Sequence, residues 1–418
     1  MDVWLIHLGE QLPVDGMTRP FRYSLLAGQL LKRGHSVTRW TSTFNHITKS
    51  QRFDKQTSVE LAPGYRVEFL YARGYRRNVS LARLAFHRFV ASRLVSLMER
   101  REPPDLILSS IPVPLLCKAA VSFGRSRGIP VVIDIRDKWP DVYLTAVPNR
   151  MRPIAKWALI PGYARNRRFL GAAAAIMAVS PSFLSWALAQ AGREAAEFDG
   201  VYPLAYPEPA LLPAVSEAEI TELRTAGVDP SKVVCCFIGQ FERSYDLETV
   251  IRVAQLFERA GPSNVQFVFA GSGSDEPHLR RMAQSLSNVL FLGWLNFPSL
   301  RALLRLSSVG LASYRAGASQ SIPNKPVEYL SEGLALVSSL SGDLEHLIET
   351  HKCGFSYRPS ASGELATIIS RLAGDPALLA STRERSRRLF SMSFAASKVY
   401  EEMVSRLETV VRDHRRKS

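Results

Sequence analysis

Charged residues follow directly after a strongly apolar segment in the stretch VVIDIRDKWPD at positions 131–141. The apolar part predicts a buried strand, and Arg136 and Asp137 come just beyond its carboxyl end. Ionisable side chains that face a crevice at a strand end are candidates for chemistry, as a general base or as orienting groups. The alternative is an Arg–Asp pair that only caps the strand. We favour function, and the choice between a base and an orienting role stays open.

A second group of residues has the chemistry of an anion site. Ser321, Asn324 and Lys325 surround the start of a helix predicted over 325–332. Free backbone N–H groups at a helix start, together with one ammonium, favour a phosphate or diphosphate. The alternative for Lys325 is an ordinary surface lysine.

Glycines and one arginine extend this anion chemistry. Gly271 and Ser272 follow a predicted strand, and Gly16 lies in a polar loop after the first strand, so the backbone could approach a ligand closely at both places. A simple turn explains these glycines nearly as well. Arg243 could hold a phosphate with two hydrogen bonds, or could pair with Glu242 or Asp246 on the surface.

The elements that must position these residues alternate between strand and helix. Apolar runs predict strands, and amphipathic runs predict helices between them. The predicted strands cover residues 3–8, 105–108, 131–133, 174–179, 233–238, 265–270, 289–292, 309–313 and 335–339. Such alternation predicts two doubly wound α/β domains with parallel sheets, joined at the proline-rich segment 202–209. Ligands of such sheets bind beyond the carboxyl ends of the strands, and we expect the ligand here in a cleft between the domains.

Composition limits the classes of protein that fit. The chain has 418 residues, 46% apolar and 22% charged, which is typical of a folded two-domain protein. Its four cysteines have neither metal-ligand spacing nor a disulfide framework, and they predict reduced thiols in the cytoplasm. The first residues lack a signal-peptide pattern, and no apolar run approaches the ~20 residues of a membrane span.

Several catalytic motifs are missing from the sequence. There is no Asp-x-Asp, so we expect no metal-bridged diphosphate and no cofactor. The absence of a P-loop and of a correctly placed Gly-x-Gly-x-x-Gly argues against a kinase, an NTPase and a dehydrogenase. No nucleophile elbow supports Ser-His-Asp catalysis.

The order and spacing of short motifs give the chain its family resemblance. In the second half these are GQFER at 239–243, FAGSG at 269–273, FLGW at 291–294 and SIPNKPVEYL at 321–330; in the first half they are Asp15-Gly16, RGH at 33–35 and DIRDKWP at 134–140. The chain thereby resembles the family 4 glycosyltransferases, retaining enzymes of the GT-B fold, and in particular bacterial members that build surface polysaccharides. Gln320, Gln240 and Arg136 depart from the residues that many members carry at those places.

The resemblance implies a fold, an activity and roles for residues. It implies an N-terminal acceptor domain over 1–205, a nucleotide-sugar domain over 206–390 and a C-terminal helix over 391–418 that crosses back to the first domain. The activity would be transfer of a sugar from a nucleoside diphosphate sugar to a lipid-linked or glycan acceptor, with retention and without a metal. Glu328 would accept hydrogen bonds from the donor's ribose, beside the other donor-binding residues Gly16, Arg243, Gly271, Ser272, Ser321, Asn324 and Lys325. Asp137 and Arg136 would act at the transferred sugar or at the acceptor.

The first half of the chain carries almost all of the net charge. Residues 1–205 have a net charge of +14, whereas the rest has +1. Arginines mixed with apolar residues over 73–101, and Arg165, Arg167 and Arg168, suit the surface of an anionic membrane. We therefore expect a cytoplasmic protein at the inner face of the plasma membrane; a solubilising charged face is the alternative.

Two rival functions remain at this level. Gln320 and Gln240 are compatible with a binding protein that kept the fold and lost transfer. A nucleic-acid platform would also use a basic half, but the sequence has no helix-turn-helix, zinc or aromatic-stacking signature, so we expect no nucleic acid partner.

Overall fold

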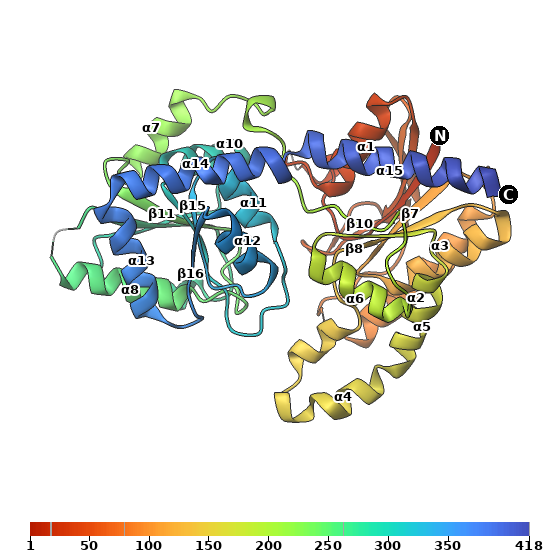
Figure 1. Ribbon diagram of the computed structural model, residues 1–418, viewed down its shortest axis with the longest axis horizontal. Helices are drawn as coiled ribbons and strands as arrows, with labels where there is room; N and C mark the ends of the chain where they lie inside the picture. Colours follow the sequence, from red (N-terminus) through yellow and green to blue (C-terminus); the bar gives the residue numbers. More distant parts are fainter. Residues whose placement is uncertain (17–18, 79, 262, 418) are drawn as a thin grey trace. The chain divides into compact units, whose positions relative to one another are not determined.

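The computed structural model describes residues 1–16, 19–78, 80–261 and 263–417, and the chain divides into two compact units. Unit 1 comprises Met1–Pro203 with Ser397–Ser418, and unit 2 comprises Leu204–Ala396. Each unit is a sheet with helices packed on it (Figure 1). No helix in the described ranges is long and apolar enough to span a bilayer.

The described part of unit 1 contains an eight-stranded sheet in the order β10-β9-β8-β7-β1-β2-β6-β5. Its strands are Asp2–Ile6 (β1), Ser36–Ser42 (β2), Thr57–Ala62 (β5), Tyr65–Leu70 (β6), Leu106–Ile111 (β7), Val131–Ile135 (β8), Ala175–Ala178 (β9) and Gly200–Val201 (β10), with a separate hairpin of Phe44–Asn45 (β3) and Ser50–Gln51 (β4). The helices are Arg22–Lys32 (α1), Leu81–Met98 (α2), Pro114–Arg127 (α3), Arg152–Ala158 (α4), Ile160–Gly171 (α5) and Pro181–Ala191 (α6).

The topology of unit 1 selects one place on its sheet for a ligand. The strands are parallel apart from edge strand β5, and β7 and β8 are buried along their whole length, as strands covered on both faces must be. From β1 the chain winds outward in one direction through β2 and β6, and from β7 in the other through β8 and β9. The carboxyl ends of β1 and β7 therefore form the topological switch point, where doubly wound sheets bind ligands.

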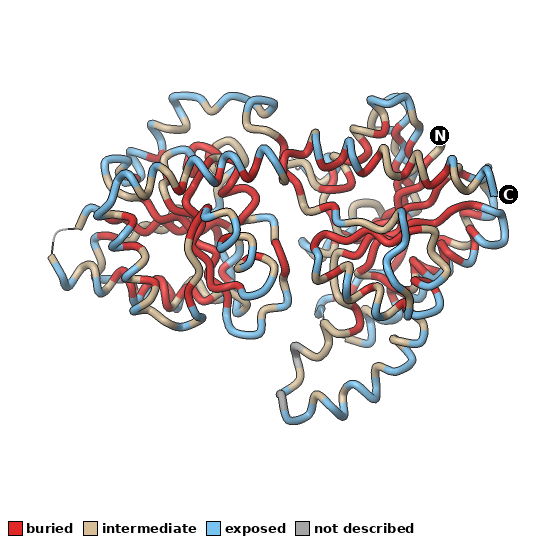
Figure 2. The backbone as a smooth tube through the Cα atoms, in the orientation of Figure 1, coloured by how far each residue is buried: buried red, intermediate tan, exposed pale blue. Residues whose placement is uncertain are grey.

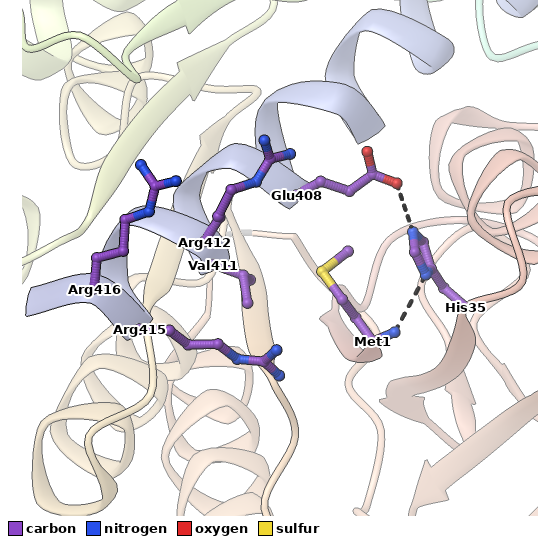
Figure 3. Close-up of a pocket in the computed structure, with 7 residues that line it drawn as sticks. All are labelled: Met1, His35, Glu408, Val411, Arg412, Arg415 and Arg416. Atoms are coloured by element: carbon purple, nitrogen blue, oxygen red, sulfur yellow. Dashed lines mark hydrogen bonds and ion pairs between the residues drawn. The ribbon is translucent and has the colours of Figure 1, made fainter. Parts of the chain in front are cut away.

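The C-terminal helix α15, Ala396–Lys417, is held to unit 1 by polar contacts. Glu408 accepts a hydrogen bond from Arg33 at 2.9 Å. It also accepts one from His35 at 2.8 Å, and His35 accepts one from the Met1 amine at 3.2 Å (Figure 3). These groups border a cavity of about 450 Å³ that is also lined by Val411, Arg412, Arg415 and Arg416. The cavity lies at the amino ends of β1 and β2, opposite the ligand-binding edge, so it is a junction between helix and sheet.

The described part of unit 2 contains a six-stranded parallel sheet in the order β13-β12-β11-β14-β15-β16. Its strands are Val233–Ile238 (β11), Val265–Ala270 (β12), Val289–Gly293 (β13), Val309–Ala312 (β14), Ala335–Ser338 (β15) and Gly354–Ser356 (β16). The helices are Glu217–Thr225 (α7), Leu247–Arg259 (α8), Glu276–Met282 (α9), Phe297–Leu306 (α10), Asn324–Ser331 (α11), Asp343–His351 (α12), Ser362–Gly374 (α13) and Pro376–Ser393 (α14). This is the doubly wound order 3-2-1-4-5-6, with its switch point between β11 and β14.

The predicted alternation of strands and helices is confirmed, with small differences at the ends of elements. Strands 233–238 and 265–270 are observed with the predicted bounds. The strand predicted over 3–8 is observed as Asp2–Ile6. The antiparallel pair β5–β6 and the short helix α4 were not anticipated by the sequence patterns.

Candidate functional site

Two loops at the carboxyl edge of unit 2 interlock through glycines. Gly239 N donates to Ala270 O at 2.8 Å, and Phe241 N donates to Ser272 O at 2.9 Å. A Cβ on Gly271, whose φ is +144°, would lie 1.8 Å from Gly239 O, and one on Gly273 would lie 2.4 Å from Phe241 O. Only glycine fits at these positions because the two backbones touch, so the glycines set the shape of the switch point.

Lys325 enters the same place from α11. Its Nζ lies 3.4 Å from the centroid of the Tyr245 ring and 3.9 Å from that of Phe237. A Cβ on Gly239 would approach the Lys325 Cε to 2.7 Å, so the lysine stem lies directly against the first loop. Two aromatic rings hold the ammonium through cation–π attraction beside the β11 loop. The surface-lysine alternative is therefore wrong.

Glu328 lies one turn further along α11 and is 1% exposed. A glutamate on the outer face of a helix is normally solvated, whereas the Glu328 side chain is almost completely buried. Its neighbour Tyr329 fixes the helix to the sheet: the Tyr329 hydroxyl accepts from Ile238 N at 3.1 Å and donates to Leu311 O at 3.2 Å. Tyr329 thereby ties α11 to both strands that flank the switch point.

The remaining predicted anion-site residues differ in their surroundings. The Ser321 hydroxyl donates to Asp343 Oδ2 at 2.5 Å and is buried, so this side chain already has a structural partner. Asn324, Ser272 and Arg243 are exposed. Asp246, a proposed partner of Arg243, instead accepts hydrogen bonds from Thr249 and Ser360 at 2.9 and 2.8 Å.

In unit 1, Arg136 is held beyond the end of β8 by two side chains. Its guanidinium donates to Glu10 Oε1 at 2.6 Å and to His7 Nε2 at 3.0 Å. Because His7 Nε2 accepts, its Nδ1 carries the proton and donates to Ser110 Oγ at 2.6 Å. Burial, with Arg136 nearby, keeps the pKa of His7 well below its usual value, so the ring is neutral.

A buried ion pair between Arg22 and Asp134 stabilises the end of β8, the strand that precedes Arg136. Arg22 donates to both oxygens of Asp134, at 3.0 and 2.9 Å, and to the carbonyls of Tyr202 and Pro203 at 2.8 and 3.0 Å. The Tyr23 hydroxyl adds a third bond to Asp134 at 3.2 Å. The expectation that the charges after the strand predicted over 131–133 lie outside the core is wrong for Asp134, which is buried within β8 and is compensated there by these donors.

The Asp137 carboxylate has a fixed orientation. Lys138 N donates to Oδ1 at 2.9 Å, and Trp139 Nε1 donates to Oδ2 at 3.0 Å. Burial raises the pKa of Asp137 against the opposing effect of these bonds. A carboxylate with a raised pKa is a better proton acceptor, so both proposed roles stay chemically possible. The cap in which Arg136 and Asp137 pair with each other is not what the structure shows, since each has other partners.

A small aromatic pocket lies at the switch point of unit 1, and sequence reasoning missed it. It has a volume of about 60 Å³ and is lined by Leu8, Gly9, Phe44, His46, Tyr75, Arg83, Phe86, His87, Pro112 and Val113. Arg83 lies over the Trp139 ring, 5.1 Å from its centroid, which links the pocket to the side chain that holds Asp137. Burial, followed by nearby cations, lowers the pKa of His46 and of His87 to about 4. The pocket therefore combines aromatic faces, one cation and two neutral imidazoles.

Gly16 ends a short 3-10 turn, Pro13–Asp15 (η1), in a left-handed conformation with φ +73°. Arg52 donates to both oxygens of Asp15, at 2.7 and 2.8 Å, and lowers the pKa of that carboxyl against its burial. Asp15 thus fixes the loop, and the structure supplies the turn that the sequence left as an alternative for Gly16.

Comparison with known proteins decides the family. Residues 232–375 match the family described as glycosyl transferases group 1, and residues 22–203 match the glycosyl transferase 4-like domain. The chain is a GT-B glycosyltransferase. It is 25% identical over 281 residues to the alpha-D-kanosaminyltransferase of Streptomyces kanamyceticus, which covers 66% of this chain and 69% of that protein.

Solved structures agree on the fold of this glycosyltransferase. Sucrose-phosphate synthase from Thermosynechococcus elongatus superposes with a TM-score of 0.73 at 15% identity over 99% of both chains. Anabaena HepE, solved in complex with UDP and glucose, gives 0.67 at 17% identity over 98% of this chain and 100% of that one. At these identities the likeness establishes the GT-B fold.

Proposed function

We propose that the glycosyltransferase moves a sugar from a nucleoside diphosphate sugar, bound by unit 2, to a lipid-linked or glycan acceptor in cell-surface polysaccharide synthesis. The observation that carries the donor half is the glycine-interlocked edge of unit 2, with Lys325 held against it. A diphosphate fits there because backbone loops, a helix start and an ammonium converge at a switch point. Anabaena HepE, a structure of the same fold, was solved in complex with UDP and glucose, which supports a nucleotide as the ligand of this fold.

The buried carboxylate of Glu328 supplies the second half of donor recognition. A planar carboxylate can accept two hydrogen bonds from the vicinal hydroxyls of a ribose. Gln320, eight positions earlier, would face the transferred sugar as an amide rather than as a carboxylate. Arg243, Asn324 and Ser272 are exposed near the ends of these loops and are proposed to join the diphosphate contacts when donor binds.

The chemical step is proposed to use Arg136 and Asp137. Arg136, oriented by Glu10 and His7, would hold the transferred sugar or a phosphate oxygen through its remaining N–H groups. Asp137 would accept the proton of the attacking hydroxyl, with the aromatic pocket beside it binding the acceptor. Lys325 would stabilise the charge that the departing diphosphate gains, in place of a metal ion, and the proposed outcome is retention of configuration.

The acceptor is proposed to be presented at the inner face of the cytoplasmic membrane. The net charge of +14 on residues 1–205 supports attraction to anionic lipids, which contributes about 1 kcal/mol for each basic residue near the surface.

Calorimetric titration with UDP, GDP, ADP and CMP tests the donor half. We expect one diphosphate nucleotide to bind the wild type and Glu328→Gln to weaken it about tenfold or more, because the amide replaces one of two charged acceptor oxygens. Glu349→Gln, at an exposed position on α12, is the matched control and should bind as the wild type does. Binding of none of the four, or equal binding by Glu328→Gln, would contradict the proposed site.

A further inference from the structure

Helix α4 of unit 1 is apolar in sequence yet has no buried residue. The exposed fraction is 77% for Trp157, 70% for Ile154, 52% for Ile160 and 49% for Met151. Figure 2 shows the α4 segment in the colours of exposed and intermediate residues only. Single exposed apolar side chains are ordinary on a protein surface, but four of them within ten residues form a patch that needs a covering surface.

The helix also extends away from the sheet. In Figure 1, α4 lies at the end of an arm that leaves the sheet of unit 1, and it packs chiefly against its sequence neighbours Asp141–Ala146 (η2), Asn149–Met151 (η3) and α5. The patch therefore does not pack on the hydrophobic core that the other helices of unit 1 cover. An apolar helix that extends away from the sheet can contact another surface without a change in the fold of unit 1.

The charge of the surrounding chain indicates which kind of surface covers the patch. Residues 142–193 contain no aspartate or glutamate, and they contain seven lysines and arginines. Arg150, Arg152 and Lys156 alternate with the apolar side chains of the patch, and Lys156 is exposed. Tryptophan and isoleucine among cations, with no acid, are typical of helices that lie in the headgroup region of an anionic bilayer.

A groove beside α4 adds a place for a headgroup. It has a volume of about 780 Å³, and its lining includes Arg152, Lys156 and Tyr163. Its acidic residue, Asp141, already accepts hydrogen bonds from Tyr163 and, at 2.6 Å, from Trp186. Two cations therefore line the groove, while the Asp141 carboxylate in the same lining already accepts hydrogen bonds from neutral donors.

We propose that α4, with Met151 and Ile160 at its ends, is the element that inserts into an anionic lipid bilayer, with Trp157 and Ile154 in the acyl boundary and Arg152 and Lys156 at the phosphates. This rests on the proposed function only in its biological purpose, since an anchored unit 1 would meet a lipid-linked acceptor at the surface. The binding itself needs no donor and no transfer.

Sedimentation of the full chain with vesicles tests the anchor. Wild type should pellet with vesicles that contain phosphatidylglycerol and stay in solution with phosphatidylcholine alone. Trp157→Glu should weaken binding about tenfold or more, because it places a carboxylate at the apolar–phosphate boundary. Trp294→Glu is the matched control: Trp294 is 66% exposed in unit 2, and this variant should bind as wild type does.

Fluorescence quenching separates insertion from attraction at a distance. Brominated acyl chains should quench wild type and Trp294→Phe, and the quenching should be lost in Trp157→Phe. Equal pelleting of wild type and Trp157→Glu would overturn the proposal, as would wild type that stays in solution. If wild type forms a dimer and does not bind vesicles, and Trp157→Glu is a monomer, the patch is instead a contact between two copies of this chain. Failure of nucleotide binding, by contrast, would leave the vesicle result unchanged and would count only against the donor site.

Discussion

The interlocked glycines give the sharpest single-residue test of the donor edge. In Gly271→Ala the new Cβ would lie 1.8 Å from Gly239 O, a backbone atom, so the two loops must separate by more than 1 Å. Overpacking of this kind costs roughly 1–3 kcal/mol, and a non-glycine residue at φ +144° adds strain of roughly the same size. We expect a total of about 3 kcal/mol and a melting temperature of the unit 2 transition lowered by about 10 °C.

Gly261→Ala separates the clash from the backbone strain. Gly261 also has a positive φ, +98°, but apart from its chain neighbours no atom lies within 4 Å of the position that an alanine Cβ would take, so only the backbone strain of roughly 1–3 kcal/mol applies. Thermal unfolding of both full-length variants, followed by titration with the nucleotide that binds wild type, gives the comparison. Gly271→Ala should lose both stability and nucleotide affinity, whereas Gly261→Ala should keep the affinity. Equal losses in the two variants would refute the interlock.

Three further predictions concern unit 1. Asp134→Ala should destabilise the protein by roughly 3–5 kcal/mol in urea unfolding, because it leaves Arg22 buried without its carboxylate; a loss below about 1 kcal/mol would show that the pair is not needed. Burial lowers the pKa of the His87 imidazole to about 4 in the folded protein. The unfolded chain therefore binds this proton at a higher pH than the folded protein does, and the free energy of unfolding should fall as the pH drops from about 6.5 towards 4. The shift corresponds to at most about 3 kcal/mol, and His87→Gln should flatten that part of the pH curve; an unchanged slope would contradict a neutral His87. Asp137→Asn should lower kcat for transfer by about 100-fold or more and remove the acidic limb of the pH–rate profile, whereas a profile that keeps this limb would assign Asp137 an orienting role.

Elements that depend on a local residue pattern could be predicted from the sequence, whereas contacts between residues far apart along the chain could not. Strands β11 and β12 were predicted with their observed bounds because runs of apolar residues end at glycines there. The partners of Asp134 could not be read, since Arg22 lies more than a hundred positions away and the buried pair forms only when β8 and α1 meet. The aromatic pocket draws on loops after four strands, so only the sheet order brings His46 and His87 together.

The predicted site residues divide in the same way between those that follow a local pattern and those that depend on distant partners. Lys325 and the glycines lie close together because each directly follows or faces the carboxyl end of a strand of one parallel sheet. The carboxyl ends of parallel strands lie at the same edge of the sheet. The engagement of Ser321 by Asp343 was not predictable, because α12 carries no pattern that points to it. Helix α4 was missed because it is short, and its apolar residues have no buried face to give them a period.

The central claim, an enzyme that uses nucleoside diphosphate sugars through unit 2, is tested most directly by release of the nucleotide from the donor. Wild type, Glu328→Gln and Glu349→Gln would each be incubated with UDP-, GDP- and ADP-sugars, and the free diphosphate measured against a blank without enzyme. We expect wild type and Glu349→Gln to release the nucleotide from one class of donor, and Glu328→Gln to release it about tenfold or more slowly. Release that is the same in all three proteins, or absent from wild type with every donor, would contradict it.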